Sequence, residues 1–182
     1  MLKMKDILGE EDKRLRQENN DVVFPLTKDE RQMIKDMHEY LHSSQIDEIA
    51  EKLKLRPGMG LAAPQVGINK KFFVIVYEEE ENVFNYYTVV NPKLVSHSEE
   101  LIYAGVGEGC LSVNREVEGI IPRYARVSVE AFDENGNAVK HRVREELAIA
   151  FQHEIDHLNG ILFVDKIDKK NPFKNMEQMR EI

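Results

Sequence analysis

The chain has 182 residues, of which 33 are acidic and 25 basic, and its formal net charge is -8 at neutral pH. A negative surface repels nucleic-acid phosphates and anionic membranes, so neither direct nucleic-acid binding nor membrane binding is expected. Hydrophobic residues make up 42%, which is enough to bury the core of one domain of this length. We therefore expect a single domain over 1–182.

The cysteine count and the N-terminal segment both indicate a cytoplasmic protein. A single cysteine, Cys110, excludes an internal disulfide and fits a reducing compartment. The segment 1–12 mixes charged and isolated apolar residues and lacks the apolar core of a secretory signal. No stretch approaches the roughly 18 apolar residues that a membrane-spanning helix needs.

Helices are predicted first in the N-terminal third. Thr27 and Glu30 have the spacing of a capping box, and apolar residues follow at helical intervals. This pattern predicts an amphipathic helix over 28–42. A shorter helix is expected over 46–54.

The middle of the chain predicts antiparallel strands, which cover 72–77, 84–90, 124–132 and 138–143. An acidic tip at 78–82 joins the first pair, and the turn signal Asp-Glu-Asn-Gly at 133–136 joins the second. With a helix toward each end of the chain, the expected fold class is α+β. In it, antiparallel β-sheets pack around a central C-terminal helix, and an amphipathic helix precedes them.

That C-terminal helix is predicted over 145–158, because acidic residues suit its first turn and Asn159-Gly160 supplies a stop. It carries the sequence His-Glu-Ile-Asp-His at 153–157. Histidines four residues apart lie on one face of a helix, so His153 and His157 can reach a single metal ion.

Glu154 occupies an unexpected place on this helix. On a helical wheel it falls inside the apolar arc, and the two histidines lie along one edge of that arc. An unpaired carboxylate among core residues is costly, so Glu154 needs a partner or a catalytic task. As a general base it can take a proton from metal-bound water and pass it to a leaving group. The alternative is a polar helix edge whose groups make ordinary hydrogen bonds.

A catalytic site of this type usually has three protein ligands and one open position for water. Phe163 stands where a metzincin would have its third histidine, which excludes that family. Glu177 lies twenty residues after His157, a spacing compatible with a thermolysin-like peptidase. Cys110 is the other candidate, since metal binding would deprotonate its thiol. Its alternative is a small buried hydrophobic side chain.

The surroundings of Cys110 favour a ligand site. Gly107 and Gly109 let the backbone approach a ligand closely, and the N–H of Leu111 can then point at a developing oxyanion. A simple glycine turn is the alternative. From the residues alone, the choice between Cys110 and Glu177 stays open.

Three segments in this order resemble the motifs of the peptide deformylases: Gly-Met-Gly-Leu-Ala-Ala-Pro-Gln at 58–65, Glu-Gly-Cys-Leu-Ser at 108–112, and His-Glu-Ile-Asp-His at 153–157. The long N-terminal region and Arg56-Pro57 resemble the longer, Gram-positive type. The resemblance implies removal of the formyl group from N-formylmethionine on newly synthesised polypeptides. It also implies Fe2+ as the usual metal, with Zn2+, Ni2+ or Co2+ as substitutes, and leaves a transient ribosome contact open.

The resemblance carries residue roles as well. Cys110, His153 and His157 match the metal ligands, and Glu154 matches the general acid/base. In this reading the metal lowers the pKa of its water, Glu154 accepts the proton, and hydroxide attacks the formyl carbon. A non-catalytic, metal-stabilised module that only binds nascent chains is the alternative; Glu154 and Gln65 argue against it.

Further residues match the groups that hold the substrate. Gln65 and the Leu111 amide match the donors that stabilise the oxyanion, and Gly60 matches a backbone hydrogen-bonding position near the formyl or peptide group. The expected substrate-binding residues, including candidates for an apolar methionine pocket, are Met59, Gly60, Val106, Glu108, Ile149 and Ala150. The segment 144–147 is more acidic than the family leads us to expect. Arg123 is expected to pair with Asp156 and support the site from behind.

Overall fold

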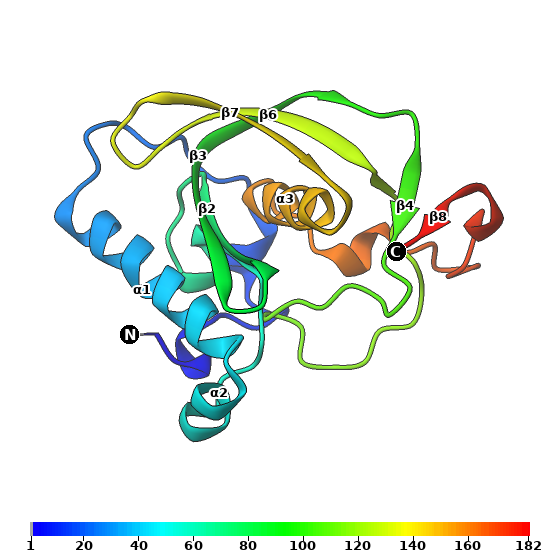
Figure 1. Cartoon of the computed structure of the whole chain (residues 1–182), viewed down its shortest axis with the longest axis horizontal. Coiled ribbons are helices and arrows are strands. Elements are labelled where there is room, and N and C mark those ends of the chain that lie inside the picture. Colours follow the sequence, from blue (N-terminus) through cyan, green and yellow to red (C-terminus); the bar gives the residue numbers. More distant parts are fainter. Residues whose placement is uncertain (1) are drawn as a thin grey trace.

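The computed structural model describes residues 2–182 (Figure 1). Its helices and strands are α1 (Lys28–Ser44), α2 (Asp47–Leu53), β1 (Gly60–Ala62), β2 (Phe72–Glu80), β3 (Val83–His97), β4 (Leu101–Tyr103), β5 (Arg123–Tyr124), β6 (Arg126–Phe132), β7 (Ala138–Arg144), α3 (Glu145–Leu158) and β8 (Arg180–Glu181). Short 3-10 helices cover Met4–Asp6, Lys13–Arg16, Ala63–Val66, Phe163–Lys166 and Met176–Gln178. The α+β fold class is confirmed.

Two sheets enclose α3. One is antiparallel and five-stranded, in the order β1-β2-β3-β6-β7; the other has the order β5-β4-β8, with β8 parallel to β4. In Figure 1, α3 lies beneath the arch of β3, β6 and β7, and α1 lies on the other side of β2. The predicted central position of the C-terminal helix is therefore confirmed.

Strand β2 explains why the sheet is covered on both sides. Successive side chains of a strand point to opposite faces, so a continuous apolar run can serve two cores. Phe73 and Ile75 belong to the core that includes Phe151 of α3. Val74 and Val76 belong to the core that includes α1 residues such as Met37. The ring of Phe73 meets that of Phe151 edge-on at 5.4 Å, a contact whose loss to alanine typically costs about 3–5 kcal/mol.

The predicted helices agree closely with the observed ones. Thr27 caps α1 by accepting a hydrogen bond from the backbone N–H of Glu30, and the Glu30 carboxylate accepts one from the N–H of Thr27. This reciprocal pair satisfies two N–H groups that have no partner inside the helix. Helix α3 begins and ends where the sequence predicts. No helix among residues 2–182 is long and apolar enough to cross a membrane.

Strand boundaries differ more. Strand β3 continues to His97, because the register shifts between Val90 and Lys93 let it leave β2 and pair with β6. The predicted strand 124–132 divides at Ala125, whose N–H donates to Glu100 and whose carbonyl accepts from Glu145. This division is what brings β5 into the second sheet. The acidic tip 78–82 is also mostly strand, since β2 extends to Glu80.

Candidate active site

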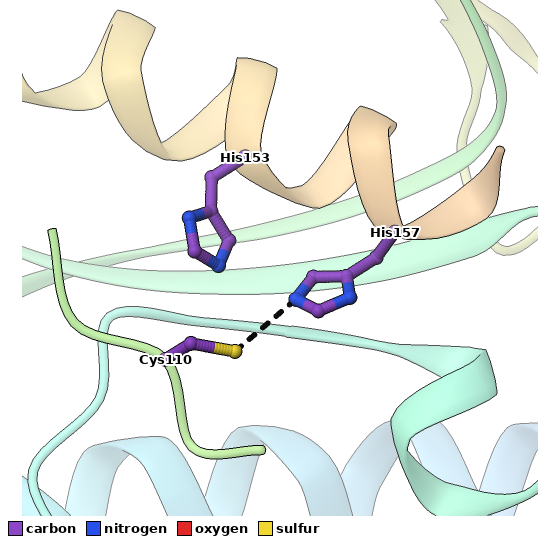
Figure 2. A group of neighbouring side chains, drawn as sticks. All are labelled: Cys110, His153 and His157. Atoms are coloured by element: carbon purple, nitrogen blue, oxygen red, sulfur yellow. Dashed lines mark hydrogen bonds between the residues drawn. The ribbon is translucent and has the colours of Figure 1, made fainter. Parts of the chain in front are cut away.

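Three potential metal ligands converge below α3. The Cys110 sulfur and a ring nitrogen from each of His153 and His157 lie within 4.8 Å of one another, and all three residues are buried. Sγ of Cys110 is 3.3 Å from Nε2 of His157 (Figure 2). The two histidines stand one turn apart on α3, and the cysteine comes from the loop after β4. The fold thus brings together all three residues predicted as ligands.

The donor set and its spacing fit a divalent cation. Two ligands at ordinary zinc–sulfur and zinc–nitrogen bond lengths, separated by a tetrahedral angle, stand about 3.6 Å apart, close to the separation of Cys110 Sγ and His157 Nε2. One thiolate with two imidazoles suits zinc, iron, cobalt or nickel. Three protein ligands also leave a fourth position for water or substrate.

A carboxylate fixes the orientation of His153. Nδ1 of His153 lies 2.8 Å from Oε2 of Glu108, which assigns the ring proton to Nδ1 and leaves Nε2 to face a metal ion. Burial alone raises the pKa of Glu108, but hydrogen bonds from Arg123 and His153 outweigh burial and lower that pKa to about 2. Glu108 is therefore ionised near neutral pH and accepts a hydrogen bond from Nδ1–H of His153.

Arg123 completes a buried charge network behind the site. Its side chain is 2% exposed and donates to both oxygens of Glu108, at 2.7 and 2.9 Å, and to Asp156 at 2.6 Å. Lys166 adds a 3.3 Å contact to Asp156. The predicted Arg123–Asp156 pair is confirmed. The Glu108 partner was missed, because nothing in the local pattern shows that the loop before Cys110 meets β5.

Glu154 is buried next to His153 on α3, as its place in the apolar arc predicts. Among residues 2–182, its Oε2 atom has no hydrogen-bond partner. Burial raises the pKa of Glu154 to about 7, against the opposing charges of His153 and Arg123. A carboxyl group with this pKa can both accept and return a proton near neutral pH.

Gln65 is held with its amide nitrogen toward the ligand cluster. Its Oε1 accepts from the N–H of Ala62 at 2.8 Å, and its Nε2 donates to Oγ of Ser112 at 3.0 Å. Nε2 also lies 3.6 Å from Sγ of Cys110. Because both ends of the amide are engaged, its direction is set before any substrate arrives. This orientation is what an oxyanion donor requires.

A cleft of about 720 Å³ opens beside these groups. Its lining includes every residue predicted to bind substrate and both predicted oxyanion donors: Met59, Gly60, Gln65, Val106, Glu108, Leu111, Ile149 and Ala150. Val106 is fully exposed and so forms part of the rim. Glu108 borders the cleft, but Arg123 and His153 already engage its carboxylate. Arg56, Tyr77 and Ile182 also line the cleft and were not predicted.

Glu177, the other candidate for the third ligand, lies elsewhere. It is exposed in the 3-10 helix Met176–Gln178 and lines a separate cavity of about 660 Å³. That cavity borders β4 and the C-terminal segment, and does not include either histidine. The geometry therefore favours Cys110 over the thermolysin-like alternative.

This fold and this cleft define the class of protein as a metal-dependent hydrolase with a His-Glu-x-x-His helix. A family profile described as polypeptide deformylase matches residues 4–173. Peptide deformylase 2 of Bacillus anthracis is 49% identical over 173 residues, covering 95% of this chain and 94% of that protein. Peptide deformylase of Oceanobacillus iheyensis is 47% identical over 182 residues and covers 100% of both. The crystal structure of peptide deformylase from Thermotoga maritima matches with a TM-score of 0.72 and 32% identity, over 89% of this chain and 96% of that one. The chain belongs to the polypeptide deformylase family.

Proposed function

We propose that Cys110, His153 and His157 hold one divalent metal ion, and that Glu154 is the general acid/base of the reaction. With these groups the chain hydrolyses the formyl group from the N-formylmethionine of newly synthesised polypeptides and releases formate. The single observation that carries this assignment is the convergence of one sulfur and two ring nitrogens within 4.8 Å, directly beside a buried carboxylate.

The proton transfers fall to Glu154. A divalent cation bound by the three ligands supplies a Lewis acid that lowers the pKa of water and polarises the formyl carbonyl. Glu154 accepts a proton from the attacking water, because its carboxylate lies beside the ligand cluster with one oxygen unengaged. It then returns the proton to the departing amine, so that formate and a free methionine amine are the products.

Gln65 and Leu111 stabilise the charge that develops on the formyl oxygen. The Gln65 Nε2 group is oriented by its contacts with Ala62 and Ser112. Leu111 lines the cleft next to Cys110. Donors that are fixed in advance need no reorganisation during the reaction, which is the main source of their effect on the rate.

The apolar part of the cleft receives the methionine side chain. Met59, Ile149 and Ala150 line it together with His153, and Val106 borders it at the rim. An unbranched thioether chain is recognised by burial and shape, which these side chains supply. Gly60, at the edge of β1, offers its backbone to the formyl or peptide group.

We propose Fe2+ as the resident metal, with Zn2+, Ni2+ and Co2+ able to replace it, because the ligand set accepts all four. A thiolate-bound ferrous site is expected to lose activity in air, and a zinc-loaded site is not. We propose that the protein acts in the cytoplasm, where its substrates, newly synthesised polypeptides, are made. Contact with the ribosome stays a prediction.

An anaerobic formate-release assay with formyl-Met-Ala-Ser tests the proposal. Iron-loaded protein is expected to turn over, chelator-treated protein to be inactive, and re-addition of Fe2+ to restore turnover. The unformylated peptide Met-Ala-Ser serves as the control and should remain intact. Cleavage of its peptide bonds, without formate release from the formylated peptide, would overturn the assignment.

A further inference from the structure

Ile182, which directly follows β8, lines the substrate cleft. Strand β8 pairs in parallel with β4, and Ile182 continues the pairing: its N–H donates to the carbonyl of Tyr103 and its carbonyl accepts from Gly105, both at 3.0 Å. These backbone bonds place Ile182 in the lining of the cleft, with 37% of its surface exposed. An apolar side chain is thus held at the edge of the catalytic cleft by a strand that the sequence pattern did not reveal.

A two-point ion pair between Arg180 and Glu145 joins β8 to α3. Arg180 donates to both carboxylate oxygens of Glu145, at 2.7 and 2.8 Å, and to Glu100 at 2.8 Å. Glu145 is the first residue of α3 and lines the cleft as well. Two-point contacts between a guanidinium and a carboxylate fix direction as well as distance. The position of Ile182 relative to α3 is therefore set by Arg180.

The same strand also fixes the rim of the cleft. The Glu181 carboxylate accepts a hydrogen bond of 3.0 Å from the Tyr103 hydroxyl. It lies so close to Gly105 that an added Cβ would collide with it. Gly105 directly precedes Val106, the exposed apolar residue of the rim. Residues 180–182 therefore hold two apolar groups, Ile182 and Val106, at the cleft.

The size of the cleft leaves room for more than formylmethionine. A volume of about 720 Å³ lies within the range of roughly 300–1,000 Å³ that accommodates drug-sized ligands. The formyl group must lie at Glu154, and the methionine side chain is expected to occupy the apolar surface beside α3. The residues that follow the formylmethionine must then lie along the rest of the cleft, which Ile182 lines.

We propose that Ile182, held by Arg180, selects the residues that follow the formylmethionine and favours apolar side chains there. The inference rests on the proposed function and deepens it. Ile182 is then a specificity-determining residue that touches substrate, and Arg180 is a positioning residue. Burying one apolar side chain against the exposed part of Ile182 is expected to change kcat/KM about fivefold.

The test compares formyl-Met-Leu-Ala and formyl-Met-Ala-Leu with the same peptides in which asparagine replaces leucine, using the metal-loaded full chain. At one of the two positions, leucine is expected to be preferred by about fivefold in kcat/KM. Ile182→Ser should abolish this preference by lowering kcat/KM for the leucine peptide to that for the asparagine peptide. The matched control is Phe173→Ser, which removes another exposed apolar side chain of the same segment outside the cleft. It should keep the preference.

A second pair of variants tests whether Arg180 positions Ile182. Arg180→Ala should raise KM for the preferred leucine peptide about fivefold, while kcat and the KM of formyl-Met stay unchanged. Arg126→Ala is its control, because Arg126 also contacts Glu100 but is not part of β8. Equal effects of Arg180→Ala on all substrates would indicate a merely structural role and overturn the positioning assignment.

The two proposals fail in different ways. If wild-type protein releases formate and Ile182→Ser keeps the leucine preference, or if no preference exists at either position, the specificity inference is wrong. If wild-type protein releases no formate from any formyl-Met compound, the proposed function itself is wrong.

Discussion

Gly60 lies against the carboxylate of Glu154: a Cβ added at position 60 would stand 2.8 Å from Cδ of Glu154 and closer still to Oε1. The edge strand β1 and the catalytic helix α3 therefore approach each other at a point where no side chain fits. This contact sets the position of the Glu154 carboxylate relative to the cleft.

Gly60→Ala is expected to displace the Glu154 carboxylate without disturbing the three metal ligands. Since a misplacement of about 1 Å can cost roughly a hundredfold in rate, kcat for formyl-Met-Ala-Ser should fall by about that factor. Metal content after dialysis should match that of the wild type. Unchanged kcat in a folded, metal-loaded variant would contradict this role of Gly60.

Glu154→Gln removes the proton acceptor but keeps the shape of the side chain. Turnover is expected to fall by about 10²–10⁴, the usual contribution of a general acid/base. The metal should stay bound, and the free energy of unfolding should not decrease, because a neutral amide is easier to bury than a carboxylate. Formate release and urea unfolding on the same preparation check both parts. Retained turnover would exclude Glu154 as the acid/base.

Cys110→Ser is expected to abolish tight metal binding, because a serine hydroxyl does not replace a thiolate as a ligand. Metal content measured after dialysis against a weak chelator should drop from one ion per chain to near zero. Glu177→Ala is the matched control and should retain the metal, since Glu177 lines a different cavity. The opposite result would restore the thermolysin-like alternative.

Arg123→Met is expected to destabilise the fold strongly. It removes the guanidinium partner of the buried Glu108 carboxylate and of the partly buried Asp156. Breaking a buried pair in this way costs about 3–5 kcal/mol. Arg115→Ala supplies the contrast: Arg115 contacts Glu10 with 53% of its side chain exposed, and its loss should cost at most about 1 kcal/mol. Urea unfolding of both variants checks the difference.

His38 should make the protein less stable in mild acid. Burial lowers its pKa from 6.5 to about 4, so between these pH values the unfolded chain binds a proton that the folded chain does not. Stability contributed by the neutral ring is therefore present above pH 6.5 and is lost as the pH falls toward 4. His38→Gln can keep the hydrogen bond to Thr88, which is 2.9 Å in the wild type. Between pH 7.5 and pH 5 it should lose about 1–2 kcal/mol less than the wild type, allowing for partial exposure. Equal losses would contradict the assignment to His38.

Local signals predicted the long elements well. Helix α3 was found from its acidic first turn, its apolar arc and its stop, and the same arc correctly placed Glu154 in the core. The polar side of that helix was harder to interpret. Gln152 is buried and exchanges two 2.9 Å hydrogen bonds with the backbone of Tyr124, because sheets cover α3 on more than one side. A helical wheel shows which residues share a face, but not what covers that face.

The short strands could not be predicted. Strands β1, β4 and β8 have only two or three residues each, too few for an alternating pattern. They are stabilised by partners distant in the sequence, as in the pairing of Ile102 with Arg180. For the same reason the residues missed at the site, Ile182 and the Arg123 partner of Glu108, depend on long-range contacts. The residues predicted from motifs required only their local sequence.

Cys110 and the two histidines of α3 are separated by a long segment of the chain, which affects how metal binding would stabilise the fold. A cation shared by Cys110 and the two histidines of α3 would act as a removable cross-link, comparable to the disulfide that a chain with one cysteine cannot form. A cross-link between Cys110 and α3 closes the chain segment that lies between them, and closing a long segment restricts the conformations of the unfolded chain. The metal binds far more weakly to the unfolded chain, because its ligands are then far apart. Chelation should therefore free the Cys110 loop first, and make it the segment where a protease begins to cut.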